Sequence, residues 1–203
     1  MSTRIGVVGG TFDPIHLGHV ALAQAALECA GLDRVLLIPA ARPPHRRPAE
    51  ATAEDRYSMT RLAAAGLARI EVSDAELRRA GPSYTADTLA ALQDQNPGAE
   101  LFLVLGWDAA REIRQWHRPE RVLELARLIV VNRPGLPAPS QEDLRAAGLD
   151  PAQVLLCTAN TPDINATRVR QVLAEGGDLD GLLNPEVARY LVERGLYGAG
   201  DRE

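Results

Sequence analysis

The chain has 203 residues, enough for one domain with a full hydrophobic core. Hydrophobic residues make up 46% of the sequence and charged residues 24%, an ordinary balance for a soluble globular protein. The net charge of -5 argues against a protein built mainly to bind nucleic acid. The apolar runs are too short to span a membrane and the N-terminus has no secretory pattern, so we expect no membrane partner and a cytoplasmic location.

The basic residues restrict the chemistry. All 22 are arginine, and the sequence contains no lysine. This absence excludes an adenylyl-lysine intermediate, a Schiff base and pyridoxal attachment, so a phosphate site must use arginine, histidine, backbone or a metal. The two cysteines, Cys29 and Cys157, are too few and too isolated to predict a disulfide framework.

Apolar runs and amphipathic stretches alternate along the chain. The apolar runs predict strands at residues 5–8, 35–38, 70–72, 101–105, 128–131 and 154–156. The amphipathic stretches predict a helix after His19 and further helices at 53–67, 85–92, 119–126, 140–147, 167–173 and 185–193. We expect a loop at 132–139 and a frayed end from 198 to 203. The alternation predicts a single α/β domain over 1–203, a parallel sheet with helices on both faces and a helical C-terminal portion.

Residues 9–19 form the most informative segment. They read Gly-Gly-Thr-Phe-Asp-Pro-Ile-His-Leu-Gly-His and join the first predicted strand to the first predicted helix. In an open parallel sheet, ligands bind at the carboxyl ends of the strands and the positive end of a helix. His16 and His19 are three residues apart, so on the first turn of a helix they face the same way. Glycines admit a phosphate close to the backbone and imidazoles donate to its oxygens, so the segment predicts a triphosphate site.

The two common phosphate-binding fingerprints are absent from this segment. The chain lacks G-x-x-x-x-G-K-[ST], and its N-terminal glycines do not form G-x-G-x-x-G. A zinc site needs another ligand beyond His16 and His19, and the only other histidines are His45 and His117. We therefore predict no protein-bound metal. Simple helix capping by the two histidines stays open as the structural alternative.

Residues 10–19 resemble the signature of the H-x-G-H nucleotidyltransferases, and later segments narrow the resemblance to the nicotinate mononucleotide adenylyltransferase family. The resemblance covers nearly the whole chain. It implies a Rossmann-like nucleotidyltransferase fold and Mg²⁺ carried by ATP. It also implies catalytic roles for His16 and His19, and ATP contacts from these two and from Gly9, Gly10, Thr11 and Phe12.

A basic, proline-stiffened loop at 41–48 follows the second predicted strand. From charge alone, a solvated loop without a ligand is an equal alternative. The family carries Pro-Pro-His-Lys here, which implies that His45 contacts the mononucleotide and that Arg46 stands at the position of the ATP-binding lysine. The charge is retained, although a flat guanidinium is not equivalent to an ammonium.

Residues 163–170 follow the last predicted strand and open a helix. The family has Ile-Ser-Ser-Thr-x-Ile-Arg here, which implies ATP contacts from Ile164, Thr167 and Arg170. The chain departs from the family at Asn165 and Ala166, where serines are expected; backbone donors are unaffected by this change. From composition alone, helix capping by Asn165 is the favoured role.

The mononucleotide side is also implied by the resemblance. Thr85, in a Pro-Ser-Tyr-Thr segment, stands where a backbone amide of the family meets the pyridine carboxylate. Trp116 matches the tryptophan that stacks on the pyridine ring, and Arg133 the arginine that holds the mononucleotide phosphate. Gly106 and Asp108 match the family's Gly-x-Asp, in which the aspartate faces the nucleotide ribose; the resemblance implies that both are ATP contacts.

The residues alone leave other roles open on this side. Asp108 could equally cap the following helix, and a lone tryptophan such as Trp116 is more often a core residue. We interpret Tyr84 and Trp107 as packing residues.

The expected reaction is attack by a mononucleotide phosphate oxygen on the α-phosphorus of ATP, with loss of pyrophosphate and no covalent enzyme intermediate. The nucleophile is already ionised, so the site must align two polyanions and stabilise charge, which His16 and His19 suit. The expected partners are ATP and nicotinate mononucleotide, and the sequence allows a homo-oligomer. The alternatives are another acceptor, a binding module without catalysis, and an aminoacyl-tRNA synthetase fragment, for which the chain lacks length and basic surface.

Overall fold

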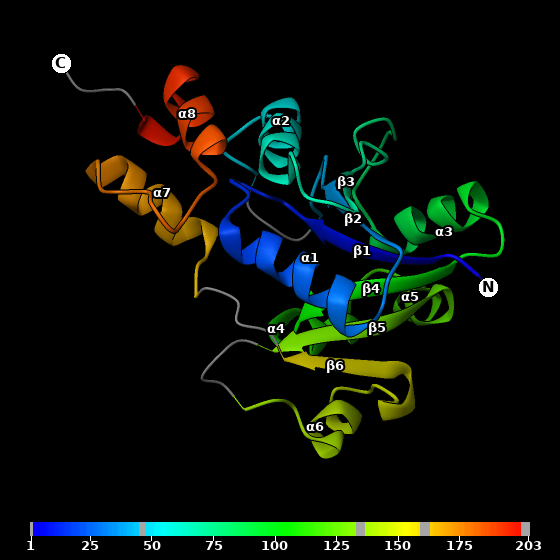
Figure 1. Ribbon diagram of the computed structural model, residues 1–203. Coiled ribbons are helices and arrows are strands. Elements are labelled where there is room, and N and C mark those ends of the chain that lie inside the picture. Colours follow the sequence, from blue (N-terminus) through cyan, green and yellow to red (C-terminus); the bar gives the residue numbers. More distant parts are fainter. Residues whose placement is uncertain (1, 45–47, 133–136, 159–162, 200–203) are drawn as a thin grey trace.

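The computed structural model describes residues 2–44, 48–132, 137–158 and 163–199, and these form one parallel sheet between helical layers (Figure 1). Within the described residues the sheet has six strands in the order β3-β2-β1-β4-β5-β6, and every pair is parallel. The strands are β1 Arg4–Gly10, β2 Arg34–Pro39, β3 Ile70–Val72, β4 Glu100–Gly106, β5 Ala126–Asn132 and β6 Val154–Thr158. The predicted α/β fold with a parallel sheet is confirmed.

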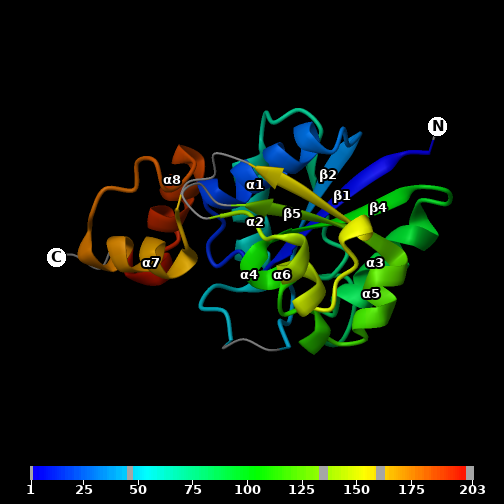
Figure 2. The same ribbon diagram turned by 90° about the horizontal axis from the view of Figure 1, so that it is seen from below.

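Helices cover both faces of the sheet. One layer contains α1 Leu17–Cys29 and α2 Ala53–Ala64, with α7 Ala166–Glu175 and α8 Pro185–Glu193 extending it past the carboxyl ends of the strands (Figures 1 and 2). The other layer contains α3 Thr85–Gln95, α4 Trp107–Ala110, α5 Pro119–Leu125 and α6 Gln141–Ala146. Across the described ranges, no helix has the length and apolar character needed to cross a membrane.

Alternation along the strands divides the apolar side chains between two cores. In β1, Val8 belongs to the core under α1 and α2, whereas Ile5 and Val7 belong to the core under α3 and α5. In β4, Val104 and Leu105 divide in the same way. Burial on both faces explains why these strands are continuous apolar runs in the sequence.

Several boundaries differ from the sequence-based predictions. The helix predicted at 53–67 ends at Ala64, since Gly66 adopts a left-handed φ of 78°. Ala126, predicted to end a helix, instead pairs with Leu101 and begins β5. The apolar periodicity does not predict the short helix α4. Fraying from residue 198 is wrong for Ala199, which is only 5% exposed; residues 200–203 lie outside the described residues.

The sheet opens at its centre. The β1–β2 ladder continues to Gly10 and Pro39, but the β1–β4 ladder ends at Val7 and Leu103, three residues before either strand ends. The strand order reverses direction between β1 and β4, the point at which open α/β sheets form a ligand crevice. The carboxyl ends of β1 and β4 therefore separate where a ligand is expected.

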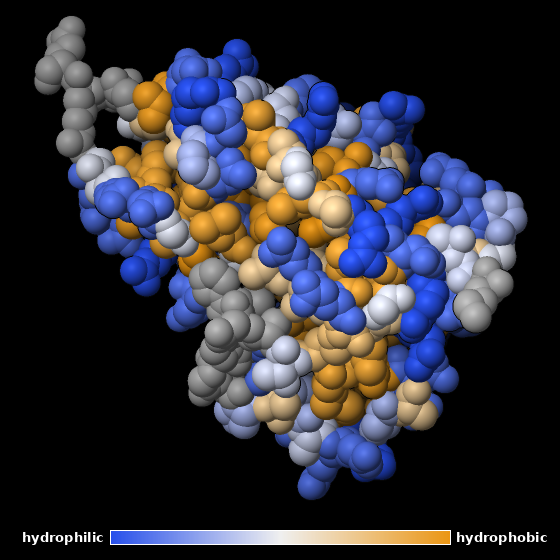
Figure 3. Space-filling model, in the orientation of Figure 1, coloured by the Kyte–Doolittle hydropathy of each residue, from blue (hydrophilic) through white to orange (hydrophobic). Residues whose placement is uncertain are grey.

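Cys29 and Cys157 form a disulfide, which corrects the expectation of isolated cysteines. Their Cα atoms are 6.0 Å apart although 128 positions separate them in the sequence, a proximity that only the fold creates. The bond joins the last residue of α1 to β6, an edge strand whose Leu156 is 39% exposed. Figure 3 shows apolar side chains gathered over this edge of the molecule.

We expect reduction of the Cys29–Cys157 bond to lower the free energy of unfolding by about 2–5 kcal/mol, because the bond closes a long loop in the unfolded chain. Denaturant unfolding with and without a reductant measures the change. Cys29→Ser is the control, since its stability should be insensitive to the reductant. Two titratable thiols in the unreduced, unfolded protein would contradict the assignment.

Candidate active site

His16 and His19 stack on each other where β1 leads into α1. Their ring centroids are 3.7 Å apart with an interplanar angle of 26°. His16 is the N-cap residue of α1 and is 7% exposed. The predicted orientation of both imidazoles toward the same side is confirmed, at the positive end of the helix dipole and beside the opened sheet.

The alternative role of the two histidines, capping of the helix, is also observed. The backbone N–H of His16 donates to Nδ1 of His19 at 3.3 Å. An accepting Nδ1 puts the ring proton of His19 on Nε2, the atom that would donate to a phosphate oxygen. Capping therefore selects the tautomer that phosphate binding needs, and the two roles are compatible.

Phe12 packs behind the histidines. Its ring meets the His19 ring edge-on at 4.9 Å, its backbone adopts a left-handed φ of 50°, and it is 2% exposed. A Cβ on Gly10 would lie 2.6 Å from the Phe12 ring, so only glycine fits there. The Phe12 side chain therefore belongs to the core, and a nucleotide could contact Phe12 only through its backbone. Gly10 is required by the packing of Phe12, and it too could contact a nucleotide only through its backbone.

Gly9 and Gly106 have the opposite surroundings. They lie at the ends of β1 and β4, and a Cβ built on either would have no heavy atom within 4 Å. Packing therefore does not require glycine at these two positions. Both leave the backbone open to a ligand at the crevice between the strands.

A buried arginine ties together the loops around this crevice. Arg56 is 1% exposed and donates to the carbonyl oxygens of Thr11 and Ala40, both at 2.6 Å. It also donates to the carbonyls of Ala51 and Ala41, at 3.3 Å each. Burial lowers the pKa of this guanidinium, and the nearby Asp13 opposes that shift. The segments after β1 and β2 and before α2 are thereby held in one arrangement.

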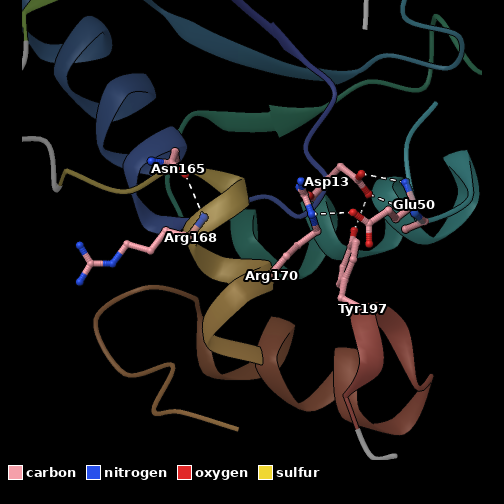
Figure 4. Close-up of polar contacts among 7 residues, drawn as sticks. Asp13, Glu50, Asn165, Arg168, Arg170 and Tyr197 are labelled. Atoms are coloured by element: carbon pink, nitrogen blue, oxygen red, sulfur yellow. Dashed lines mark hydrogen bonds and ion pairs between the residues drawn. The ribbon is translucent and has the colours of Figure 1, made fainter. Parts of the chain in front are cut away.

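Asp13 connects this core to the C-terminal helices (Figure 4). Its carboxylate accepts from the backbone N–H groups of Glu50 at 2.9 Å and Ala51 at 3.1 Å, and from the Tyr197 hydroxyl at 2.6 Å. Its carbonyl oxygen accepts from Arg170 at 2.7 Å, while Nε of Arg170 pairs with Glu50 at 2.8 Å. Asp13 is 8% exposed, whereas the Glu50 side chain at the rim of the cluster is 58% exposed. The cluster lies at the loop between β1 and α1, residues 11–16, called the motif loop below.

The residues of segment 163–170, predicted to bind phosphates at the start of α7, have different structural roles. Arg170 reaches the motif loop, and Thr167 is exposed on the first turn of the helix. Ile164 is 5% exposed in the core. Asn165 caps α7 by accepting from the Arg168 backbone N–H at 2.9 Å, and the Arg168 guanidinium points away from the Asp13 cluster in Figure 4. The predicted capping role of Asn165 is confirmed.

Two of the predicted mononucleotide residues, Thr85 and Trp116, lie in the other helical layer. Thr85 is the first residue of α3, whose N-cap residue Tyr84 makes no side-chain capping bond, so the helix start can accept an anion. Tyr84 stacks on His117, with centroids 3.9 Å apart, and thereby places the Trp116 segment beside Thr85. Trp116 itself is partly buried against the core under α3 and α5. This stack agrees with the interpretation of Tyr84 as a packing residue, and Trp107 also packs against that core.

Asp108 does not cap a helix. It lies inside α4, whose N-cap residue is Gly106, and its side chain is 68% exposed with Arg111 at 3.9 Å. A solvent-facing carboxylate next to the crevice suits the ribose role implied by the resemblance. The predicted contacts His45, Arg46 and Arg133 lie outside the described residues.

The acidic, histidine and cysteine side chains of the described residues do not gather into a metal site. In this part of the chain, no group of three or more of them is arranged to hold a metal ion.

Sequence reasoning missed three polar residues of the site: Arg56, Asp13 and Tyr197. Asp13 lies inside the motif, but the sequence assigns it no role. Tyr197 gives no local signal, because its partner Asp13 is 184 positions away. The partners of Arg56 lie 5 to 45 positions away, in segments that only the fold brings together. Its one local signal is a charged residue on a helix face that is otherwise largely buried.

This sheet order, with open glycines and stacked histidines at its central crevice, defines a nucleotide-binding α/β enzyme of the Rossmann-like class. The family model described as cytidylyltransferase-like matches residues 7–172. A Pseudomonas syringae protein named "Probable nicotinate-nucleotide adenylyltransferase" is 40% identical over 97% of this chain and 94% of its own. A Thermus thermophilus protein of the same name is 43% identical, over 96% and 99%.

A solved structure shows the same fold. Plasmodium falciparum nicotinic acid mononucleotide adenylyltransferase, complexed with NaAD, has a TM-score of 0.82 at 17% identity, covering 98% of this chain and 100% of its own. The chain belongs to the cytidylyltransferase-like family and, within it, to the nicotinate-nucleotide adenylyltransferases.

We expect Gly9→Ala to fold with the stability of the parent but to bind a non-hydrolysable ATP analogue about tenfold more weakly, because its methyl group would occupy only ligand space. Gly6→Ala is the control. A Cβ there lies 2.7 Å from Leu32, so overpacking should cost about 1–3 kcal/mol of stability. Calorimetric titration and thermal unfolding measure the two effects. Unchanged affinity in Gly9→Ala would remove this glycine from the site.

Proposed function

We propose that this protein transfers the adenylyl group of ATP to nicotinate mononucleotide, forming nicotinate adenine dinucleotide and pyrophosphate. The observation that carries the proposal is the stacked His16–His19 pair at the start of α1, beside the separated ends of β1 and β4. Relatives with the corresponding name cover the whole length of the chain, and the structural neighbour was solved with NaAD.

The reaction is a direct displacement. A phosphate oxygen of the mononucleotide bonds to the α-phosphorus, and the bond from that phosphorus to the β-phosphate bridging oxygen breaks. No base is required because the attacking oxygen is already ionised, and the lysine-free chain offers no lysine for an adenylyl intermediate. The protein contributes alignment and charge stabilisation. Mg²⁺ enters as part of the ATP substrate and shields its phosphates.

The residues divide between the two substrates according to the layer that carries them. His16 and His19 donate to the triphosphate and stabilise the charge that develops on phosphorus and the leaving group. Arg170 adds a donor from the same layer, and the backbone at Gly9 adds one from the sheet. Thr85 and Trp116, in the opposite layer, hold the pyridine carboxylate and ring. In-line attack occurs across the crevice between β1 and β4.

We place the reaction in the cytoplasm, where ATP is available. Disulfides are rare in reducing compartments. A cytoplasmic location therefore implies that Cys29 and Cys157 are mostly reduced inside the cell and form their bond under oxidising conditions.

Pyrophosphate release from MgATP, with nicotinate mononucleotide and nicotinamide mononucleotide in parallel, tests the function. We expect kcat/KM to be at least tenfold higher for the acid, because the open helix start at Thr85 favours a carboxylate. Equal use of both acceptors would remove the specificity claim but keep the chemistry. Release with neither would overturn the function.

Replacing His19 with alanine should lower kcat by about 10²- to 10³-fold, since losing one charge-stabilising donor typically has this effect. Steady-state pyrophosphate release measures the loss, and thermal unfolding checks that the variant is folded. Turnover within threefold of the parent would leave His19 with its capping role alone.

A further inference from the structure

Two tyrosines tether the C-terminal helices to the rest of the molecule. Tyr190, on α8, donates to Asp55 of α2 at 2.8 Å. Tyr197, in the one-turn helix η3 (Leu196–Gly198) that follows, donates to Asp13 of the motif loop at 2.6 Å. Both bonds join a tyrosine hydroxyl to a buried aspartate, but only the second reaches a segment of the candidate active site.

Asp13, the partner of Tyr197, accepts hydrogen bonds through both its side chain and its backbone. Its carboxylate accepts from the Tyr197 hydroxyl and from the backbone before α2, and its carbonyl oxygen accepts from Arg170 (Figure 4). Asp13 is three residues before His16 in the same loop. A displacement of Asp13 would therefore be transmitted both to the stacked histidines and to Arg170.

Tyr197 is held in place at a conformational cost. Its φ of 55° is left-handed, which a tyrosine adopts only when its surroundings determine it. Burial and the bond to Asp13 raise the pKa of the phenol, so it stays a proton donor throughout the working pH range. Of the four non-glycine residues with positive φ in the described chain, Phe12 contacts His19 and Tyr197 contacts Asp13, and both of these contacts converge on the motif loop.

We propose that Tyr197 is a positioning residue for the triphosphate side of the site: through Asp13 it sets the placement of His16, His19 and Arg170. This inference rests on the proposed function, in that the triphosphate is ATP. It assigns to the C-terminal segment a part in ATP binding without contact to ATP. Thr85 and Trp116, the described mononucleotide residues, lie in the other layer, so we expect the effect to be selective for ATP.

Tyr197→Phe tests the inference, with Tyr190→Phe as the matched control. Each variant deletes one hydroxyl and one tyrosine–aspartate tether, so both should lower the melting temperature modestly. Tyr197→Phe should raise the KM for ATP, and the Kd of a non-hydrolysable ATP analogue, about five- to tenfold, because only part of the free energy of one hydrogen bond to a charged partner is transmitted to the ATP site. The KM for nicotinate mononucleotide should stay within twofold, and Tyr190→Phe should change neither constant by more than twofold.

Three outcomes would overturn the inference. They are unchanged ATP constants in Tyr197→Phe, an equal change in both variants, and a fall in the active fraction with the Kd unaltered, which is the mark of a merely structural bond. The binding measurement separates this failure from that of the proposed function. A parent that binds the analogue but releases no pyrophosphate with the mononucleotide refutes the function, while the Kd comparison still decides the role of Tyr197. A parent that does not bind the analogue overturns both.

Discussion

The arrangement of the loops around the site depends on the hydrogen bonds that the buried Arg56 guanidinium donates to backbone carbonyls. Its donors go to carbonyl oxygens from three separate segments, the loops after β1 and β2 and the turn before α2. Loops carry many backbone polar groups, and burying them unpaired is costly. Arginine has five donors in a rigid fork, so one side chain satisfies several carbonyls and holds them in a common geometry. Removing it would leave those carbonyls without a donor at the crevice.

The two helical layers separate the tasks of the site. The layer with α1, α2 and α7 presents histidines, a helix start and Arg170, all suited to a polyphosphate. The opposite layer presents the open start of α3 and an aromatic segment, suited to a flat ring with a carboxylate. The crevice between β1 and β4 lies between them. Under the proposed function, this topology would bring two anionic substrates together, with their binding groups on different sides of one sheet.

Local structure and chemistry support each other at the motif. Gly10 is required by the close approach of Phe12, Phe12 packs against His19, and His19 accepts from the backbone of His16. Each contact is a packing or capping interaction in its own right. Together they orient two imidazoles at a helix start, the arrangement in which positive dipole and ring donors act on the same phosphate.

The strands, most helices and the location of the motif can be predicted from the sequence, because apolar periodicity and glycine-rich turns are local properties. The prediction that His16 and His19 lie on one side of a helix start is correct for the same reason. Local pattern does not predict that Cys29 meets Cys157, that Ala126 begins a strand, or that Tyr197 and Arg56 support the motif loop. These contacts join residues far apart in the chain and depend on the tertiary structure, since sheet order and helix packing set which distant side chains become neighbours.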